Sequence, residues 1–142
     1  MTKAEIAKNY FLEGYNCSQA VALAFMDELN LSKDDIAALT IGLGGGLARL
    51  RLTCGAVSAM AIVISYVKCK NLSKLDAYTI IQKACKEFTD EVGTLICGEL
   101  LEGVPVKPGI APEERTPEYY KKRPCAELVA LAASIAEKYI ND

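Results

Sequence analysis

Four of the six cysteines lie where a helix is expected to begin. Asparagine and threonine are preferred helix caps and proline is favoured in the first turn, so each segment predicts a helix that begins beside a thiol. The unpaired N–H groups and partial positive charge of a helix N-terminus favour a thiolate over a thiol. Four such starts commit much of a 142-residue chain to helices and predict one shared chemistry for the thiols. The segments are Asn16-Cys17-Ser18-Gln19, Thr53-Cys54-Gly55-Ala56, Thr94-Leu95-Ile96-Cys97 and Arg123-Pro124-Cys125-Ala126.

Apolar residues recur with helical spacing along nearly the whole chain, and β-branched residues nowhere alternate as they would in a strand. This pattern predicts an all-α, single-domain helical bundle of about six helices over residues 1–142. All five prolines lie between Pro105 and Pro124, which predicts a Pro-rich irregular connection before the last helix, with one turn at Thr116-Pro117. The predicted helices run from Ala4 to before Gly14, from Asn16 through Phe25, from Ser32 through Leu43, from Thr53 to about Lys68, from Ser73 through Val92, from Thr94 to about Leu101, and from Pro124 onward.

Composition excludes several classes of partner. The formal net charge is −2 and the basic residues form no run, so we expect no nucleic-acid partner. The most apolar stretch, residues 56–67, is well short of the roughly 20 residues that span a bilayer, so we expect no membrane insertion. The segment Met1–Ile6 has no apolar signal region, which predicts a cytoplasmic protein with reduced thiols.

The absence of histidine excludes serine–histidine and cysteine–histidine couples, a Rieske centre and any zinc site with a histidine ligand. The glycines from Gly42 to Gly46 match neither phosphate-loop fingerprint, because they follow a predicted helix and no Gly-Lys-Ser or Gly-Lys-Thr follows them. Gly44, Gly45 and Gly46 can let the backbone approach an anionic group closely, or can simply end a helix. No residues typical of substrate turnover stand out, so whether the chain is an enzyme stays open.

Each cysteine also has a purely structural interpretation, since free cysteine is among the residues most often buried. Cys85 lies on the apolar stripe of a predicted helix and Cys69 near a helix end, and we assign both to structure. Nearby cations should lower the pKa of two thiols. Arg49 and Arg51 precede Cys54, and Lys121, Lys122 and Arg123 precede Cys125, so we expect both thiols to ionise below the usual value of about 8.5.

Five segments of the chain resemble the C-GCAxxG-C-C family of redox-active proteins. They are Gly14-Tyr15-Asn16-Cys17-Ser18-Gln19-Ala20-Val21, the glycines Gly44 to Gly46, Cys54-Gly55-Ala56-Val57-Ser58-Ala59, Cys97-Gly98-Glu99-Leu100-Leu101 and the late Cys125. The resemblance covers nearly the whole chain and implies a site made by Cys17, Cys54, Cys97 and Cys125. One departure is Ala59, which stands where the central motif ends in glycine and adds a methyl group near the start of that helix.

Four thiolates suit an iron-sulfur cluster, whose usual ligand set is four cysteines, for electron transfer or redox sensing. The wide spacing of these four cysteines leaves three alternatives open: thiol–disulfide pairs, another soft metal such as zinc, or a structural helical module. In the cluster interpretation Gly44, Gly45 and Gly46 help to bind the cofactor. A carrier would work with a redox partner protein that the sequence does not identify, and a homo-oligomer is also left open.

Overall fold

The computed structural model describes residues 1–142, with the backbone alone for Lys122. Its described residues form nine α-helices, one short 3₁₀ helix and no strand, which confirms the all-α prediction. A single isolated antiparallel bridge joins Thr53 to Ile96. The helices are α1 (Lys3–Leu12), α2 (Cys17–Leu23), α3 (Met26–Leu29), α4 (Lys33–Thr40), the 3₁₀ helix η1 (Ile41–Leu43), α5 (Gly55–Lys68), α6 (Lys74–Val92), α7 (Cys97–Leu100), α8 (Pro117–Lys122) and α9 (Cys125–Ile140).

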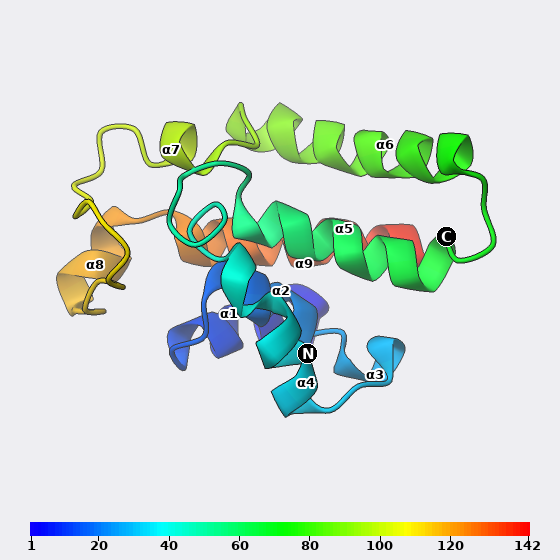
Figure 1. Ribbon diagram of the computed structural model, residues 1–142, viewed down its shortest axis with the longest axis horizontal. Coiled ribbons are helices and arrows are strands. Elements are labelled where there is room, and N and C mark those ends of the chain that lie inside the picture. The colour runs from blue at the N-terminus through cyan, green and yellow to red at the C-terminus, as the bar shows by residue number, and fades with distance from the viewer.

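The core lies where α5 and α9 run side by side (Figure 1). Helices α1 and α2 cover one side of this pair, and α6 lies along the other. The fully buried side chains that fill the space between them include Phe25, Met60, Ile64, Phe88 and Val129. None of the helices in the described chain is both long and apolar enough to cross a membrane.

Side chains at the helix starts satisfy backbone N–H groups as the sequence predicts. Asn16 and Gln19 form a capping box at the start of α2, because each side chain accepts from the backbone of the other. Ser32 and Ser73 accept from the third residue of α4 and α6. Gly93 ends α6 at a φ of 94°, a left-handed conformation that glycine adopts without strain.

The helix count exceeds the prediction because one predicted helix is divided and the turn expected at Thr116-Pro117 is a short helix, and two other helices begin later than predicted. The predicted second helix breaks after Leu23 and restarts as α3 at Met26. The short helix expected from Thr94 begins only at Cys97. The N-terminal cap of α5 is Cys54 and not Thr53, because the backbone of Thr53 pairs with Ile96 in the isolated bridge.

Helix α6 is amphipathic as predicted, but the N-terminal half of its stripe is not covered. Leu75 and Tyr78 are 75% and 61% exposed, whereas Ala84 and Phe88 are buried. Cys85 is partly buried and packs against the edge of the core. Cys85 therefore has the position expected of it, inside α6 and away from the cysteines that begin helices.

Residues 102–116, which we call the strap, connect α7 to α8 without regular structure. This confirms the predicted Pro-rich connection, and the single turn expected at Thr116-Pro117 is α8, capped by the Thr116 side chain. Most of the strap is exposed, and none of its described residues belongs to the buried core. The strap must therefore be held against the body of the protein chiefly by polar contacts.

Candidate functional site

Four cysteines stand at four helix starts, as the sequence predicts. Cys17 is the first residue of α2, Cys54 caps α5, Cys97 is the first residue of α7 and Cys125 is the first residue of α9. Cys54 and Cys97 are buried, and Cys17 and Cys125 are partly exposed. Because all four helices begin at the same end of the bundle, these thiols are brought together from distant parts of the chain.

All four cysteines line one cavity of about 490 Å³. Gly44 and Gly45 line the same cavity. Gly46 does not, but it lies directly behind Cys97, because a Cβ placed on Gly46 would be 2.7 Å from the Cys97 Cβ. Cys69 and Cys85 are absent from the described lining, in agreement with their assignment to structure.

The glycines begin a left-handed turn that forms part of the cavity wall. Every residue from Gly45 to Arg49 has a positive φ, between 47° and 73°, and Arg51 follows with a φ of 64°. Backbone hydrogen bonds close the turn, among them Ala48 N to Gly42 O at 2.9 Å and Leu52 N to Gly46 O at 2.9 Å. Non-glycine residues in this conformation cost about 1–2 kcal/mol each, so the turn stores strain beside the thiols.

Gly55 is required by the close approach of α2 and α5 at the site. A Cβ on Gly55 would lie 2.7 Å from the Cys17 Sγ and 2.8 Å from the Leu43 carbonyl oxygen. Both contacts are too short for any side chain. The absence of a side chain between Cys54 and Ala56 therefore lets the Cys17 sulfur lie against the first turn of α5.

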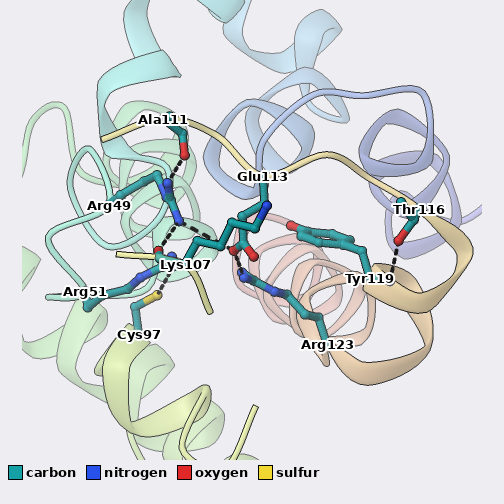
Figure 2. Close-up of polar contacts among 9 residues, drawn as sticks. All are labelled: Arg49, Arg51, Cys97, Lys107, Ala111, Glu113, Thr116, Tyr119 and Arg123. Atoms are coloured by element: carbon teal, nitrogen blue, oxygen red, sulfur yellow. Dashed lines mark hydrogen bonds and ion pairs between the residues drawn. The ribbon is translucent and has the colours of Figure 1, made fainter. Parts of the chain in front are cut away.

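Positive charge gathers on the side of the cavity that faces the strap (Figure 2). Arg49 and Arg123 both form ion pairs with Glu113 of the strap, and Arg49 also donates to the carbonyl oxygens of Lys107, at 2.8 Å, and Ala111. Arg51 donates to the Cys97 Sγ at 3.6 Å. The left-handed turn thus presents one arginine to the strap and another to a thiol.

Arg115 fixes the other end of the strap. Its guanidinium donates to the carbonyl oxygens of Phe11 and Tyr15, the latter at 2.7 Å, and lies 4.2 Å from the centre of the Phe11 ring. Tyr119 of α8 lies beside it and beside Arg123, whose guanidinium is 4.6 Å from the Tyr119 ring centre. These contacts bring the N-terminal segment, the strap and α8 together at the wall of the cavity.

Burial sets the acidity of the thiols. It raises the pKa of Cys54 to about 12 and that of Cys125 to about 11, and in both the neighbouring Cys17 raises the pKa further. Burial likewise raises the pKa of Cys17 above its ordinary value. The prediction that Cys54 and Cys125 are unusually acidic is wrong. The Ala56 and Val57 amides and the Arg123 charge favour the thiolates, but the loss of water outweighs them.

The thiols surround the cavity and do not converge on one point. Within the part of the chain that the structure describes, no three cysteine, aspartate or glutamate side chains lie close enough together to hold one metal ion. A zinc ion would need its sulfur ligands about 2.3 Å from a common centre. The arrangement therefore differs from a site preformed for a single ion.

Comparison with known families gives one result. The family model described as "Putative redox-active protein (C_GCAxxG_C_C)" matches residues 15–139. The chain belongs to this C-GCAxxG-C-C family. No curated protein and no solved structure matches the chain.

In this member of the C-GCAxxG-C-C family, the departure at Ala59 lies away from the site. Ala59 is fully buried in the core and does not line the cavity. The match begins at residue 15, yet Phe11 of α1 lines the cavity and supports Arg115. The N-terminal helix is thus part of the wall of the site.

Sequence reasoning missed the residues that the strap brings to the site. Glu113 and Arg115 of the strap line the cavity, as does Tyr119 of α8, but all three lie between Pro105 and Pro124, where the sequence predicts an irregular connection with a single turn. Of the cations expected near the thiols, Arg49, Arg51 and Arg123 line the cavity and Lys121 does not. The side chain of Lys122 lies outside the described residues.

Proposed function

We propose that Cys17, Cys54, Cys97 and Cys125 form one redox centre that holds an iron-sulfur cluster and serves electron transfer or redox sensing. The observation that carries this proposal is the meeting of four helix-start cysteines on one cavity whose wall also holds four arginines. Membership in the C-GCAxxG-C-C family supports the broader redox role.

The donor set suits a cluster better than it suits one ion. Iron-sulfur clusters are held by four cysteine thiolates that would share two or four iron atoms and not a single ion. Thiols spaced around a cavity of about 490 Å³ fit such a cluster, whereas they are too dispersed for a single ion. When bound, a cluster supplies reversible one-electron chemistry.

The protein residues have distinct parts in this proposal. Because burial keeps the thiols of Cys54 and Cys125 protonated in the metal-free protein, both release protons only when they bind metal. Arg51, which donates to the Cys97 Sγ, stabilises negative charge on that sulfur. The apolar wall around the thiols keeps water away from the centre and so tunes its reduction potential.

Purification without oxygen, followed by iron, sulfide and absorption measurements, tests the proposal. The wild-type protein should be brown and contain both iron and acid-labile sulfide. Serine at Cys17, Cys54, Cys97 or Cys125 should abolish or strongly reduce both, because a hydroxyl scarcely ionises and is a poor ligand for iron. Cys85→Ser is the matched control and should keep both.

A colourless wild-type protein without iron and sulfide would contradict the cluster. So would a Cys85→Ser variant that loses its iron while the four helix-start variants keep theirs. Circular dichroism of each variant separates loss of the site from loss of the fold.

A second candidate is reversible disulfide formation within the same four thiols. Cys17, Cys54 and Cys125 line the same cavity, and both Cys17 and Cys125 act electrostatically on the Cys54 thiol, which supports pairing among these thiols. Each bridge would form when two thiols give two electrons and two protons to an oxidant such as a small-molecule disulfide, which is reduced to two thiols. Here the protein stays colourless, and mild oxidation lowers its mass by two hydrogens per bridge.

A further inference from the structure

The cavity carries more positive than negative charge. Four guanidinium groups line it, those of Arg49, Arg51, Arg115 and Arg123, and Glu113 is the only carboxylate on the described lining. The side chains that form the ion pairs are nearly buried, with exposed fractions of 12% for Arg49, 6% for Arg123 and 14% for Glu113. Little of the surface of these three side chains is therefore open to water.

Burying like charges close together costs folding free energy unless an anion neutralises them. Arg49 and Arg51 act electrostatically on Arg123, so the three groups lie close enough to repel one another. They come from two separate segments, residues 45–51 and the link between α8 and α9. Figure 2 shows Arg49 and Arg123 paired with the carboxylate of Glu113, and Arg51 directed at the Cys97 sulfur. One carboxylate cannot balance three guanidinium groups.

The arginines differ in how many of their donors are in use. Arg49 donates to two strap carbonyls and to Glu113, and Arg115 donates to two carbonyls of the N-terminal segment. The described contacts of Arg51 comprise one long hydrogen bond, to the Cys97 Sγ. Since a guanidinium has five N–H donors, Arg51 has several left for a ligand.

The space beside Arg51 accepts a molecule larger than an ion. A cavity of about 490 Å³ corresponds to the volume of roughly sixteen liquid waters, at about 30 Å³ each. Its lining also includes apolar side chains, among them Leu100, Leu101 and Leu128. A ligand with one charged end and a short apolar body matches this mixed lining.

We propose that the metal-free protein binds a small oxyanion, a phosphate, sulfate or carboxylate group, between Arg51 and Arg123 and beside Cys97. The planar guanidinium fork matches the two oxygens of such a group, and each contact is a charge-assisted hydrogen bond. This site goes beyond the proposed redox centre and does not depend on its metal, because it is formed by arginine donors and not by the thiols.

Equilibrium dialysis on the reduced, metal-free protein tests the site, with inorganic phosphate, sulfate and malonate as separate probes at constant ionic strength in chloride. We expect saturable one-to-one binding of at least one probe, and the preferred probe identifies the headgroup. Arg51→Met should weaken binding at least tenfold. Lys121→Met removes an exposed positive charge near Arg123 that does not line the cavity, and it should leave binding unchanged.

Arg51→Lys keeps the charge but lacks the planar guanidinium group, so it separates recognition by the guanidinium from attraction by charge alone. Its affinity for the anion should lie between those of Arg51→Met and the wild-type protein. No saturable binding of any probe would overturn the proposal, as would equal loss in Arg51→Met and Lys121→Met. Iron loading is measured on separate samples. Failure to bind iron therefore contradicts the redox centre alone, and failure to bind the three probes contradicts the anion site alone.

Discussion

Replacing Gly55 with alanine tests the packing that holds the site together. The added Cβ would meet the Cys17 Sγ at 2.7 Å and the Leu43 carbonyl oxygen at 2.8 Å. The sulfur can move away, but the carbonyl oxygen belongs to the backbone and cannot move alone. Overpacking of this kind costs about 1–3 kcal/mol, and the better helix propensity of alanine returns less than about 1 kcal/mol at a first-turn position.

The net loss of unfolding free energy should therefore be about 1–2 kcal/mol, which lowers the melting temperature of a 142-residue chain by roughly 3–7 °C. Thermal unfolding of the reduced protein, followed by circular dichroism, measures this shift. The Cys17 thiol should also become more reactive toward an alkylating reagent, because its sulfur is displaced from α5.

Gly42→Ala is the matched control. A Cβ on Gly42 meets nothing within 4 Å, and the φ of Gly42 lies outside the left-handed region. Its melting temperature should stay the same or rise slightly. Equal melting temperatures for Gly55→Ala and Gly42→Ala would refute the packing at Gly55 described above.

Three other perturbations test separate features. Ala48→Gly should raise the unfolding free energy by about 0.5–1 kcal/mol, because Ala48 has a φ of 47°, whereas Ala38→Gly in the exposed face of α4 should lower it by a similar amount; urea unfolding compares the two. Above about pH 8.5 the Cys54 thiol loses its proton in the unfolded chain, whereas in the folded protein it keeps the proton up to its pKa of about 12. The unfolding free energy should therefore fall with rising pH, by up to about 1.4 kcal/mol per pH unit from this thiol. Urea unfolding at several pH values measures this dependence, which Cys54→Ser should make shallower. Glu113→Gln should release the strap and speed its cleavage by a protease several-fold, whereas the same change at exposed Glu114 should not; equal cleavage rates would show that Glu113 does not hold the strap.

The sequence predicts the elements whose ends are specified locally. Asn16 with Gln19 identifies the start of α2, and Ser73 and Gly93 identify both ends of α6. The placement of the four cysteines around one cavity was also predictable, because helix starts in a small bundle can share one end. The cap at Cys54 was missed because the Thr53 bridge depends on Ile96, which is distant in sequence.

Two properties of the site depend on tertiary structure and could not be read from sequence. The pKa of Cys54 was predicted in the wrong direction because neighbouring cations are visible in a sequence, whereas the depth of burial is not. Glu113 and Arg115 were missed because an irregular segment gives no periodicity from which to place its side chains.

The dispersed placement of the four cysteines bears on the order in which the proposed iron-sulfur centre would be assembled. In zinc-finger peptides the ligands lie near one another in sequence, and metal binding itself drives folding. Here the nearest pair, Cys97 and Cys125, is separated by the whole strap, so an unfolded chain offers an incoming guest no chelating pair. For the proposed cluster, folding would come first, and the guest would then enter a finished cavity. The strap supplies Glu113 and Arg115 to the wall of that cavity, so a donor of the proposed cluster would meet a folded protein with the strap in place.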